Sequence, residues 1–158
     1  MNLVLVAVGR LKDGPERALC ARYAERTAAL GRSLGLRLEL AEQPESRAAR
    51  PDDRKREEAL ALERKLGGAP FLAFDERGAA ETSEAFARRL AARRDGGAER
   101  LGLVIGGPDG LDAAFRARAE AVLSFGAMTL PHALVRVLAL EQVYRAATLL
   151  AGHPYHRA

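Results

Sequence analysis

The sequence contains a single cysteine, Cys20, among its 158 residues. One thiol excludes an internal disulfide and any zinc site built from cysteine pairs, and it fits a protein that works in a reducing cytoplasm. Long apolar runs are also missing: the run at 3–8 is too short for a signal-peptide core, and no stretch is long enough to span a bilayer. We therefore expect a cytoplasmic chain that forms one domain, residues 1–158, without a membrane segment.

Charge is scarce in the C-terminal third of the chain. Residues 1–100 contain 20 Lys+Arg and 17 Asp+Glu, whereas residues 101–158 contain only 5 and 4. Because charged side chains are rarely buried without a partner, the C-terminal segment is expected to lie in the core or against a second subunit. The net charge of +4 permits a polyanionic partner without requiring one.

Short apolar runs alternate with amphipathic stretches. Continuously apolar runs are typical of parallel strands covered on both faces, and they occur at 2–9, 69–74 and 100–107. Strict alternation at 36–40 suits an edge strand, and a last short strand followed by a loop is expected in 121–130. Helical patterns occupy 15–31, 51–66, 83–95, a short stretch after Asp112, and 132–151. Ser83 and Asp112 are the expected N-terminal caps of their helices. The alternation predicts an α/β fold with a mainly parallel sheet between helix layers.

Three of the expected strands end in suggestive residues: "FDERG" at 74–78, "GGPDG" at 106–110 and "FGAMTLPH" at 125–132. Ligands of such folds bind past the carboxyl ends of the strands, so these segments should meet at one edge of the sheet. The paired glycines allow backbone to approach a ligand, but their spacing matches neither the dinucleotide fingerprint nor the P-loop, and a tight turn is the alternative. The loop at 42–53 is expected to be flexible.

The expected helix at 132–151 is apolar nearly all round, with Glu141, Arg145 and Thr148 on one stripe. A helix that is hydrophobic on several sides must be covered on several sides, either as a core helix of a monomer or against a twin helix in a two-fold dimer. His153 and His156 lack the further ligands of a metal site, so no metal is expected. The basic residues near 50 form either a solvated helix start or a phosphate-contacting surface: Arg47, Arg50, Arg54, Lys55 and Arg56.

Three blocks of sequence, in this order, carry a resemblance to one family: "LVAVGRLK" at the start, "IGGPDGL" in the middle, and "MTLPHALVRVLALEQVYRA" followed by "HPYHR" at the end. Together they resemble the RlmH methyltransferases of the SPOUT class, which methylate N3 of a pseudouridine in 23S ribosomal RNA. The resemblance covers the whole chain. It implies a deep C-terminal trefoil knot, a homodimer, and S-adenosylmethionine bound inside the knot.

The resemblance also assigns the cofactor positions to Phe74, where a leucine often stands, Gly106, Phe125, Gly126, Ala127, Met128, Thr129 and Leu130. A side chain at Gly106 is expected to collide with the cofactor. In the family, the C-terminal tail of one subunit reaches the pocket of the other, which would place Tyr155 and His156 in an active site.

His132 or His156 could remove the N3 proton, and Arg145 could hold a phosphate or a base carbonyl. Family enzymes of this size lack an added RNA-binding domain, so the dimer is expected to read a shaped RNA surface, such as the large subunit or the assembled ribosome. Two alternatives remain open: a non-enzymatic RNA-binding or ribosome-assembly factor, or an enzyme of the same fold that acts on another nucleotide.

Overall fold

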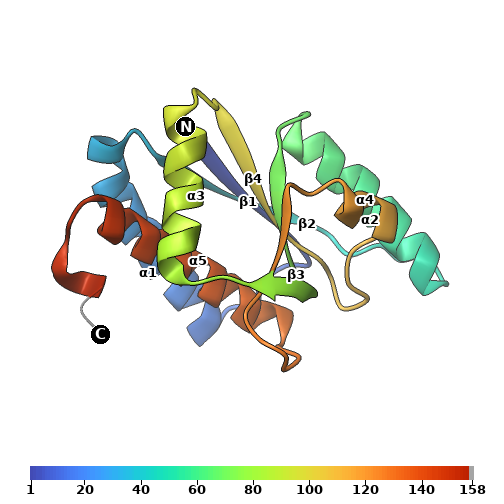
Figure 1. Cartoon of the computed structure of the whole chain (residues 1–158). Helices are drawn as coiled ribbons and strands as arrows, with labels where there is room; N and C mark the ends of the chain where they lie inside the picture. The colour runs from blue at the N-terminus through green and yellow to red at the C-terminus, as the bar shows by residue number, and fades with distance from the viewer. Residues whose placement is uncertain (157–158) are drawn as a thin grey trace.

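The computed structural model describes residues 1–156, and for His156 it describes the backbone alone. Within this range one sheet is covered by helices on both faces (Figure 1). The elements in chain order are β1 (Asn2–Val8), α1 (Pro15–Leu34), β2 (Arg37–Gln43), α2 (Pro51–Leu66), β3 (Phe71–Ala80), α3 (Ser83–Asp95), β4 (Arg100–Ile105), α4 (Ala113–Ala117), β5 (Ala121–Ser124), α5 (His132–Leu150) and a 3-10 turn, Pro154–His156.

The five strands lie in the order β2-β1-β4-β3-β5, and every neighbouring pair is parallel. This arrangement confirms the predicted parallel sheet. The predicted edge strand is β2, which lies at one border of the sheet and is largely exposed, as its alternating charged residues require. Because every strand runs in the same direction, all carboxyl ends meet at one edge of the sheet.

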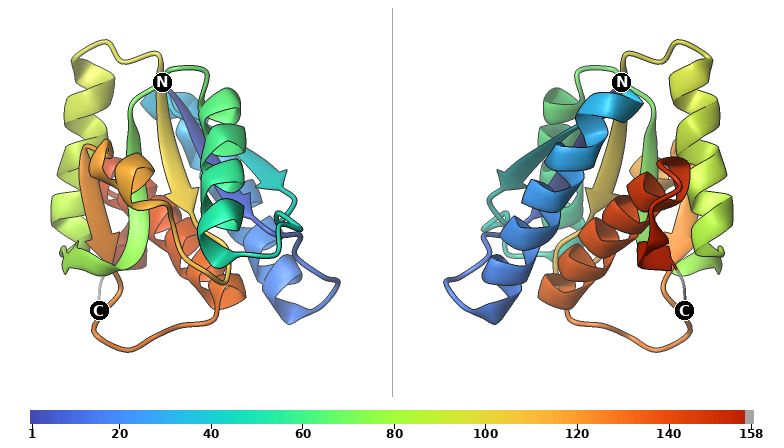
Figure 2. Two further views of the ribbon diagram at one scale, coloured as in Figure 1. Left: turned by 90° about the vertical axis from the view of Figure 1, so that its right-hand side faces the viewer. Right: turned by 90° about the vertical axis from the view of Figure 1, so that its left-hand side faces the viewer.

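Side-chain alternation along the strands divides the core into two layers. On β1, Leu3 and Leu5 pack with α1, α3 and α5, whereas Val4 and Val6 pack with α2 and α4 on the opposite face. Views along the sheet show α1, α3 and α5 on one side of the strands and α2 on the other (Figure 2). Because successive side chains of a strand point to opposite faces of the sheet, the single apolar run of β1 contributes side chains to both layers of the core.

Helix α5 lies between α1 and α3, which explains why the C-terminal third carries so little charge. One arginine is nevertheless buried in it. Arg136 donates hydrogen bonds from Nη2 to the carbonyl oxygens of Val8 (2.6 Å) and Gly9 (2.7 Å), and from Nη1 to Glu42 Oε1 (3.0 Å). These bonds compensate the buried charge and fix the start of α5 to the ends of β1 and β2.

Three sequence-based boundaries were wrong, each for a local reason. The first helix continues past Gly31 to Leu34, and Gly35 takes the left-handed conformation (φ 65°) that ends it. The cap of α3 is Thr82 rather than Ser83, because the Thr82 hydroxyl accepts the hydrogen bond from the Ala85 amide. The segment expected to be a flexible loop, 42–53, instead contains the end of β2, the start of α2 and a stretch held by hydrogen bonds from α2.

The long loop between β5 and α5, residues 125–131, projects from the carboxyl edge of the sheet (Figure 2). Beside it β3 is irregular: Phe74 and Ala79 both pair with Leu123, so the residues between them bulge out of the ladder. A side chain at Gly78 would collide with the Leu123 backbone at 2.7 Å or less, so only glycine fits this crossing of β3 and β5. The trefoil knot implied by the resemblance stays a prediction, since strand order alone does not decide it.

Candidate functional site

A cavity of about 530 Å³ opens at the carboxyl edge of the sheet. Its walls come from the segments that follow β3, β4 and β5, namely residues 74–77, 105–111 and 123–132. The prediction that these three strand ends lie together is confirmed. The volume falls within the usual range of small-molecule sites.

The cavity brings together most of the residues that the resemblance assigns to the cofactor. Those that line it are Phe74, Gly106, Phe125, Gly126, Met128, Thr129 and Leu130. Ala127 belongs to the same loop but does not contribute to the lining. His132, the first residue of α5, also lines the cavity and is partly exposed, so its imidazole is accessible to a bound molecule.

The ring of Phe74 forms part of an aromatic stack and is not freely available to a ligand. Its centroid lies 5.1 Å from that of Phe125, with an interplanar angle of 8°, and 6.5 Å from that of Phe86. Only 6% of Phe74 is exposed. Phe125 covers one face of the Phe74 ring, and the assignment of Phe74 to the cofactor stays a prediction.

Two of the glycines that line the cavity, Gly106 and Gly126, differ in what surrounds them. A Cβ at Gly106 would lie 3.0 Å from the carbonyl carbon of Gly110 and 3.0 Å from Leu111 Cγ, so a side chain there would strain its own loop before it reached a ligand. The expectation that a side chain at Gly106 collides with the cofactor stays a prediction, and this packing constraint is a second reason for glycine at the position. A Cβ at Gly126 would meet nothing within 4 Å, so this backbone borders open space in the cavity.

The loop 125–131 is held by few polar contacts. The Ser124 hydroxyl donates to the Gly126 carbonyl (2.7 Å), and the Thr129 hydroxyl donates to Glu76 Oε2 (3.0 Å). Met128 is 81% exposed. No residue of this loop carries a charged side chain.

Ionic groups surround the cavity on the side of α2 and α4. Asp75, whose side chain is buried, pairs with Arg116 at 3.1 Å, and Lys55 and Asp109 also line the cavity. Sequence reasoning included Asp75 only as part of a strand end and missed Arg116, because nothing in the pattern of α4 marks it as facing a cavity.

The opposite end of α5 carries a separate polar cluster. Arg145 Nη2 lies 2.8 Å from Glu141 Oε1, and its guanidinium lies over the Tyr155 ring at 5.2 Å from the centroid. The Tyr155 hydroxyl donates to Glu141 Oε1 at 3.4 Å, and the ring meets Tyr144 edge-on at 4.7 Å. Burial raises the pKa of Tyr155 to about 12, so its hydroxyl keeps its proton at neutral pH.

Within one chain the cluster does not reach the cavity. Arg145 lies thirteen residues after His132 on the same helix, which separates them by about 20 Å along its axis. The cavity loop and the C-terminal turn accordingly lie at opposite ends of α5 (Figure 1). Thr148, expected on the same stripe, is fully buried and donates to the Arg145 carbonyl instead (2.7 Å). The side chain of His156 lies outside the described residues.

The remaining expectations concern metal, membrane and basic residues. In residues 1–156, no group of three or more His, Cys, Asp or Glu side chains is arranged to hold a metal ion. None of the helices in that range has the length and apolarity to cross a membrane. Three of the five basic residues near 50 are engaged in ion pairs, Arg54 with Asp109, Lys55 with Asp52 and Arg56 with Asp53.

Comparison with known proteins agrees with the fold. The family model described as "Predicted SPOUT methyltransferase" matches residues 1–156. The chain is 60% identical to "Ribosomal RNA large subunit methyltransferase H" of Methylobacterium radiotolerans, across 99% of this chain and 98% of that protein.

A second protein of the same name, from Sinorhizobium fredii, is 58% identical across the full length of both chains. The crystal structure of a probable methyltransferase from Bordetella pertussis Tohama I shares the fold, with a TM-score of 0.52 at 17% identity, covering 92% of this chain and 95% of that one. This chain therefore belongs to the SPOUT methyltransferase family.

Proposed function

We propose that this chain is an S-adenosylmethionine-dependent methyltransferase that modifies N3 of a pseudouridine in 23S ribosomal RNA, on the large subunit or the assembled ribosome in the cytoplasm. The observation that carries the proposal is the cavity formed by the three loops at the carboxyl edge of the sheet. Membership of a methyltransferase family, and relatives named as large-subunit ribosomal RNA methyltransferases, support it.

The residues of the cavity fit S-adenosylmethionine. The open space beside Gly126 lets backbone amides and carbonyls approach a flat heterocycle, and the apolar walls include Ile105, Leu111 and Leu123. The loops 106–111 and 125–130 would hold the cofactor. When bound, it supplies an electrophilic methyl group.

His132 is the imidazole that we assign to proton removal. It lines the cavity and begins α5, so a helix anchored by Arg136 fixes its position. The N3–H of pseudouridine is weakly acidic and must lose its proton before the nitrogen can accept a methyl group, and imidazole accepts protons near neutral pH. Burial raises the pKa of Tyr155 to about 12, which disfavours the phenolate that a base would require.

In a two-fold dimer built on α5, the first residues of this helix in one protomer would lie close to its last turns in the partner. The midpoint between His132 and Arg145 falls beside Leu138, which is only partly buried, and Leu134 is 41% exposed. If two copies of α5 cross antiparallel near Leu138, Arg145 of one protomer comes close to His132 of its partner. The interface then covers apolar surface that the monomer leaves accessible.

This dimer also gives the C-terminal turn a function. Tyr155 packs on Arg145 of its own helix, so it would be delivered to the partner's cavity together with that arginine. There the arginine could hold a phosphate or a base carbonyl, and the ring could stack on an unpaired base. The active site we propose therefore combines a cofactor pocket from one protomer with a substrate-holding cluster from the other.

Mass spectrometry of ribosomal RNA tests the proposal. Deleting the gene should remove one methyl group from a single 23S pseudouridine, and the wild-type gene should restore it. Loss of a methyl group from another RNA would indicate an enzyme of the same fold with a different substrate. Unaltered RNA, together with no calorimetric binding of S-adenosylmethionine, would indicate a non-enzymatic factor. Light scattering should report a dimer at micromolar concentration.

A further inference from the structure

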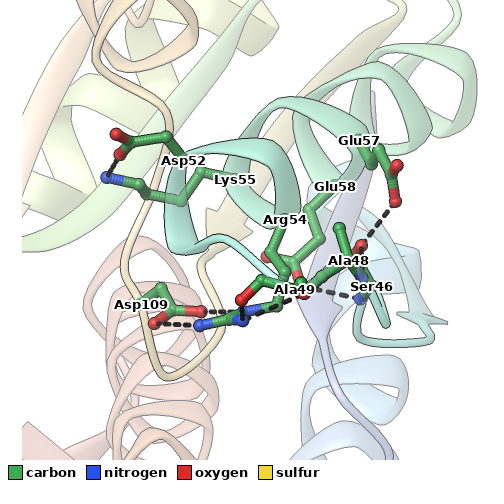
Figure 3. A network of polar contacts seen from close by, with 9 residues as sticks. All are labelled: Ser46, Ala48, Ala49, Asp52, Arg54, Lys55, Glu57, Glu58 and Asp109. Atoms are coloured by element: carbon green, nitrogen blue, oxygen red, sulfur yellow. Dashed lines mark hydrogen bonds and ion pairs between the residues drawn. The ribbon is translucent and has the colours of Figure 1, made fainter.

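One arginine near the start of α2, Arg54, contacts the turn 107–110, which lines the cavity (Figure 3). Arg54 Nε donates to Asp109 Oδ2 at 2.6 Å, and Arg54 Nη2 donates to Asp109 Oδ1 at 3.1 Å. The two parallel bonds form a bidentate pair, the geometry that a guanidinium and a carboxylate adopt at their strongest. The hydrogen bond from Arg54 lowers the pKa of Asp109, so the carboxylate is ionised across the physiological range.

The same guanidinium also holds a second loop. Its Nη1 donates to the carbonyl oxygens of Ala48 (3.0 Å) and Ala49 (3.1 Å). One side chain thus connects α2, the loop 44–50 and the loop that carries Asp109. Lysine would keep the charge but could not reproduce this planar fork, because its ammonium is a point donor.

Glu58, one turn later on α2, holds the beginning of the loop 44–50. Its Oε1 accepts a hydrogen bond from the Ser46 amide at 2.9 Å, and the side chain is almost fully buried. The loop is therefore fixed at Ser46 by Glu58 and at Ala48 and Ala49 by Arg54. The loop 44–50 beside Arg54 is therefore ordered, and it holds the Arg54 guanidinium in place to contact Asp109.

Asp109 lies at the tip of a tight turn that forms one wall of the cavity. The Gly110 amide donates to the Gly107 carbonyl at 2.9 Å, and residues 106–111 all contribute to the lining. Within residues 1–156, no other side-chain anchor of the turn is comparable to the bidentate pair, since the remaining residues of the turn are glycines and Pro108. Its position relative to the cavity therefore depends on Arg54.

We propose that Arg54 is a positioning residue of the methyltransferase site: through Asp109 it holds the turn 107–110 in the place that binds S-adenosylmethionine. The proposal rests on the cofactor pocket proposed above. Arg54 acts through Asp109 and does not touch the cofactor. A preformed turn binds more tightly because it loses less conformational freedom on binding.

The variants Arg54→Lys and Asp109→Asn test this role, with Arg56→Lys as the matched control. Arg56 lies on the same helix, its side chain is 65% exposed, and its hydrogen bonds stay within α2. Calorimetry should show S-adenosylmethionine affinity reduced about tenfold or more in both test variants, because bonds between charged groups of this kind are lost. The double variant should lose less than the sum of the single losses, since both changes remove the same pair.

Hydrogen exchange of the free protein separates positioning from general stability. In Arg54→Lys the Gly110 amide should exchange faster while amides of β1 and β4 keep their protection. Unchanged cofactor affinity in the two folded variants, or equal loss of protection throughout the sheet, would overturn the proposal. Failure of the wild-type protein to bind S-adenosylmethionine would instead refute the proposed function, and this role of Arg54 with it.

Discussion

The two ends of α5 differ in how they are built. At its first residue, His132 adjoins a cavity whose loop 125–131 is held by two hydroxyl contacts. Near its last turn, Arg145 belongs to a cluster in which side chains contact one another directly. The end at His132 leaves space for a ligand, so its loop can enclose a bound molecule. The side chains at the Arg145 end already contact one another, so a molecule that binds there must fit their existing arrangement.

Removing residues 153–158 should have the largest effect of the changes considered. It takes Tyr155 out of the cluster around Arg145 and leaves the cavity at the other end of α5 unchanged. Methylation should fall by about 10³-fold or more, since substrate orientation and interactions with the reacting base are both lost. Cofactor binding should survive, because His153, Pro154 and Tyr155, whose side chains the structure describes, do not line the cavity. Methylation assays and calorimetry measure the two effects separately.

A mixed dimer provides the control for that deletion. One protomer lacks 153–158 and keeps His132, and the other keeps its tail and carries His132→Ala. If the tail acts on its partner, the mixed dimer should recover one working site although each parent homodimer is impaired. Full activity of the truncated homodimer would show that the tail is not part of the site.

At the cavity end, His132→Gln should reduce the rate of methylation by about 10²-fold, the usual contribution of a general base. Glutamine preserves polarity and approximate size but cannot accept the proton. The loss should shrink at high pH, where the substrate nitrogen ionises without help. A pH–rate profile measures this, and a loss that stays constant with pH would assign His132 to binding only.

At the other end, Arg145→Lys should lower kcat/KM for RNA by about tenfold, with cofactor affinity unchanged. Lysine retains the charge but loses the guanidinium that bonds Glu141 and lies over the Tyr155 ring. Arg88→Lys, an exposed arginine on α3, serves as the control. Weaker cofactor binding in Arg145→Lys would contradict the division of labour between the two ends.

The smallest expected effect concerns the Tyr155 hydroxyl. Its pKa is raised to about 12 by burial, so the folded protein holds this proton while the unfolded chain releases it near pH 10. The free energy of unfolding should therefore fall between pH 10 and 12 in the wild type, by less than about 1 kcal/mol more than in Tyr155→Phe. Urea unfolding at pH 9 and pH 11 measures the difference, and equal losses would show that the phenol is not buried on α5.

Local patterns predicted most of the elements because they depend on neighbouring residues only. The apolar runs became β1, β3 and β4, and the helix over 51–66 has the predicted ends, with proline at its start and Gly67 in the left-handed conformation after it. Two expectations based on these patterns were wrong. Gly31 is inside α1, and the stretch 44–50 is ordered by Arg54 and Glu58 from the following helix.

By itself, the sequence determined the parallel sheet, the carboxyl edge as the place of the site, and most of the residues that line the cavity, because periodicity and strand ends are properties of adjacent residues. Only the tertiary structure decided that Phe74 is covered by Phe125 and that Gly106 is restricted by its own loop. It alone also placed Arg54 against Asp109, fifty-five positions away. Such contacts depend on how separate elements pack, and packing is a property of the whole fold.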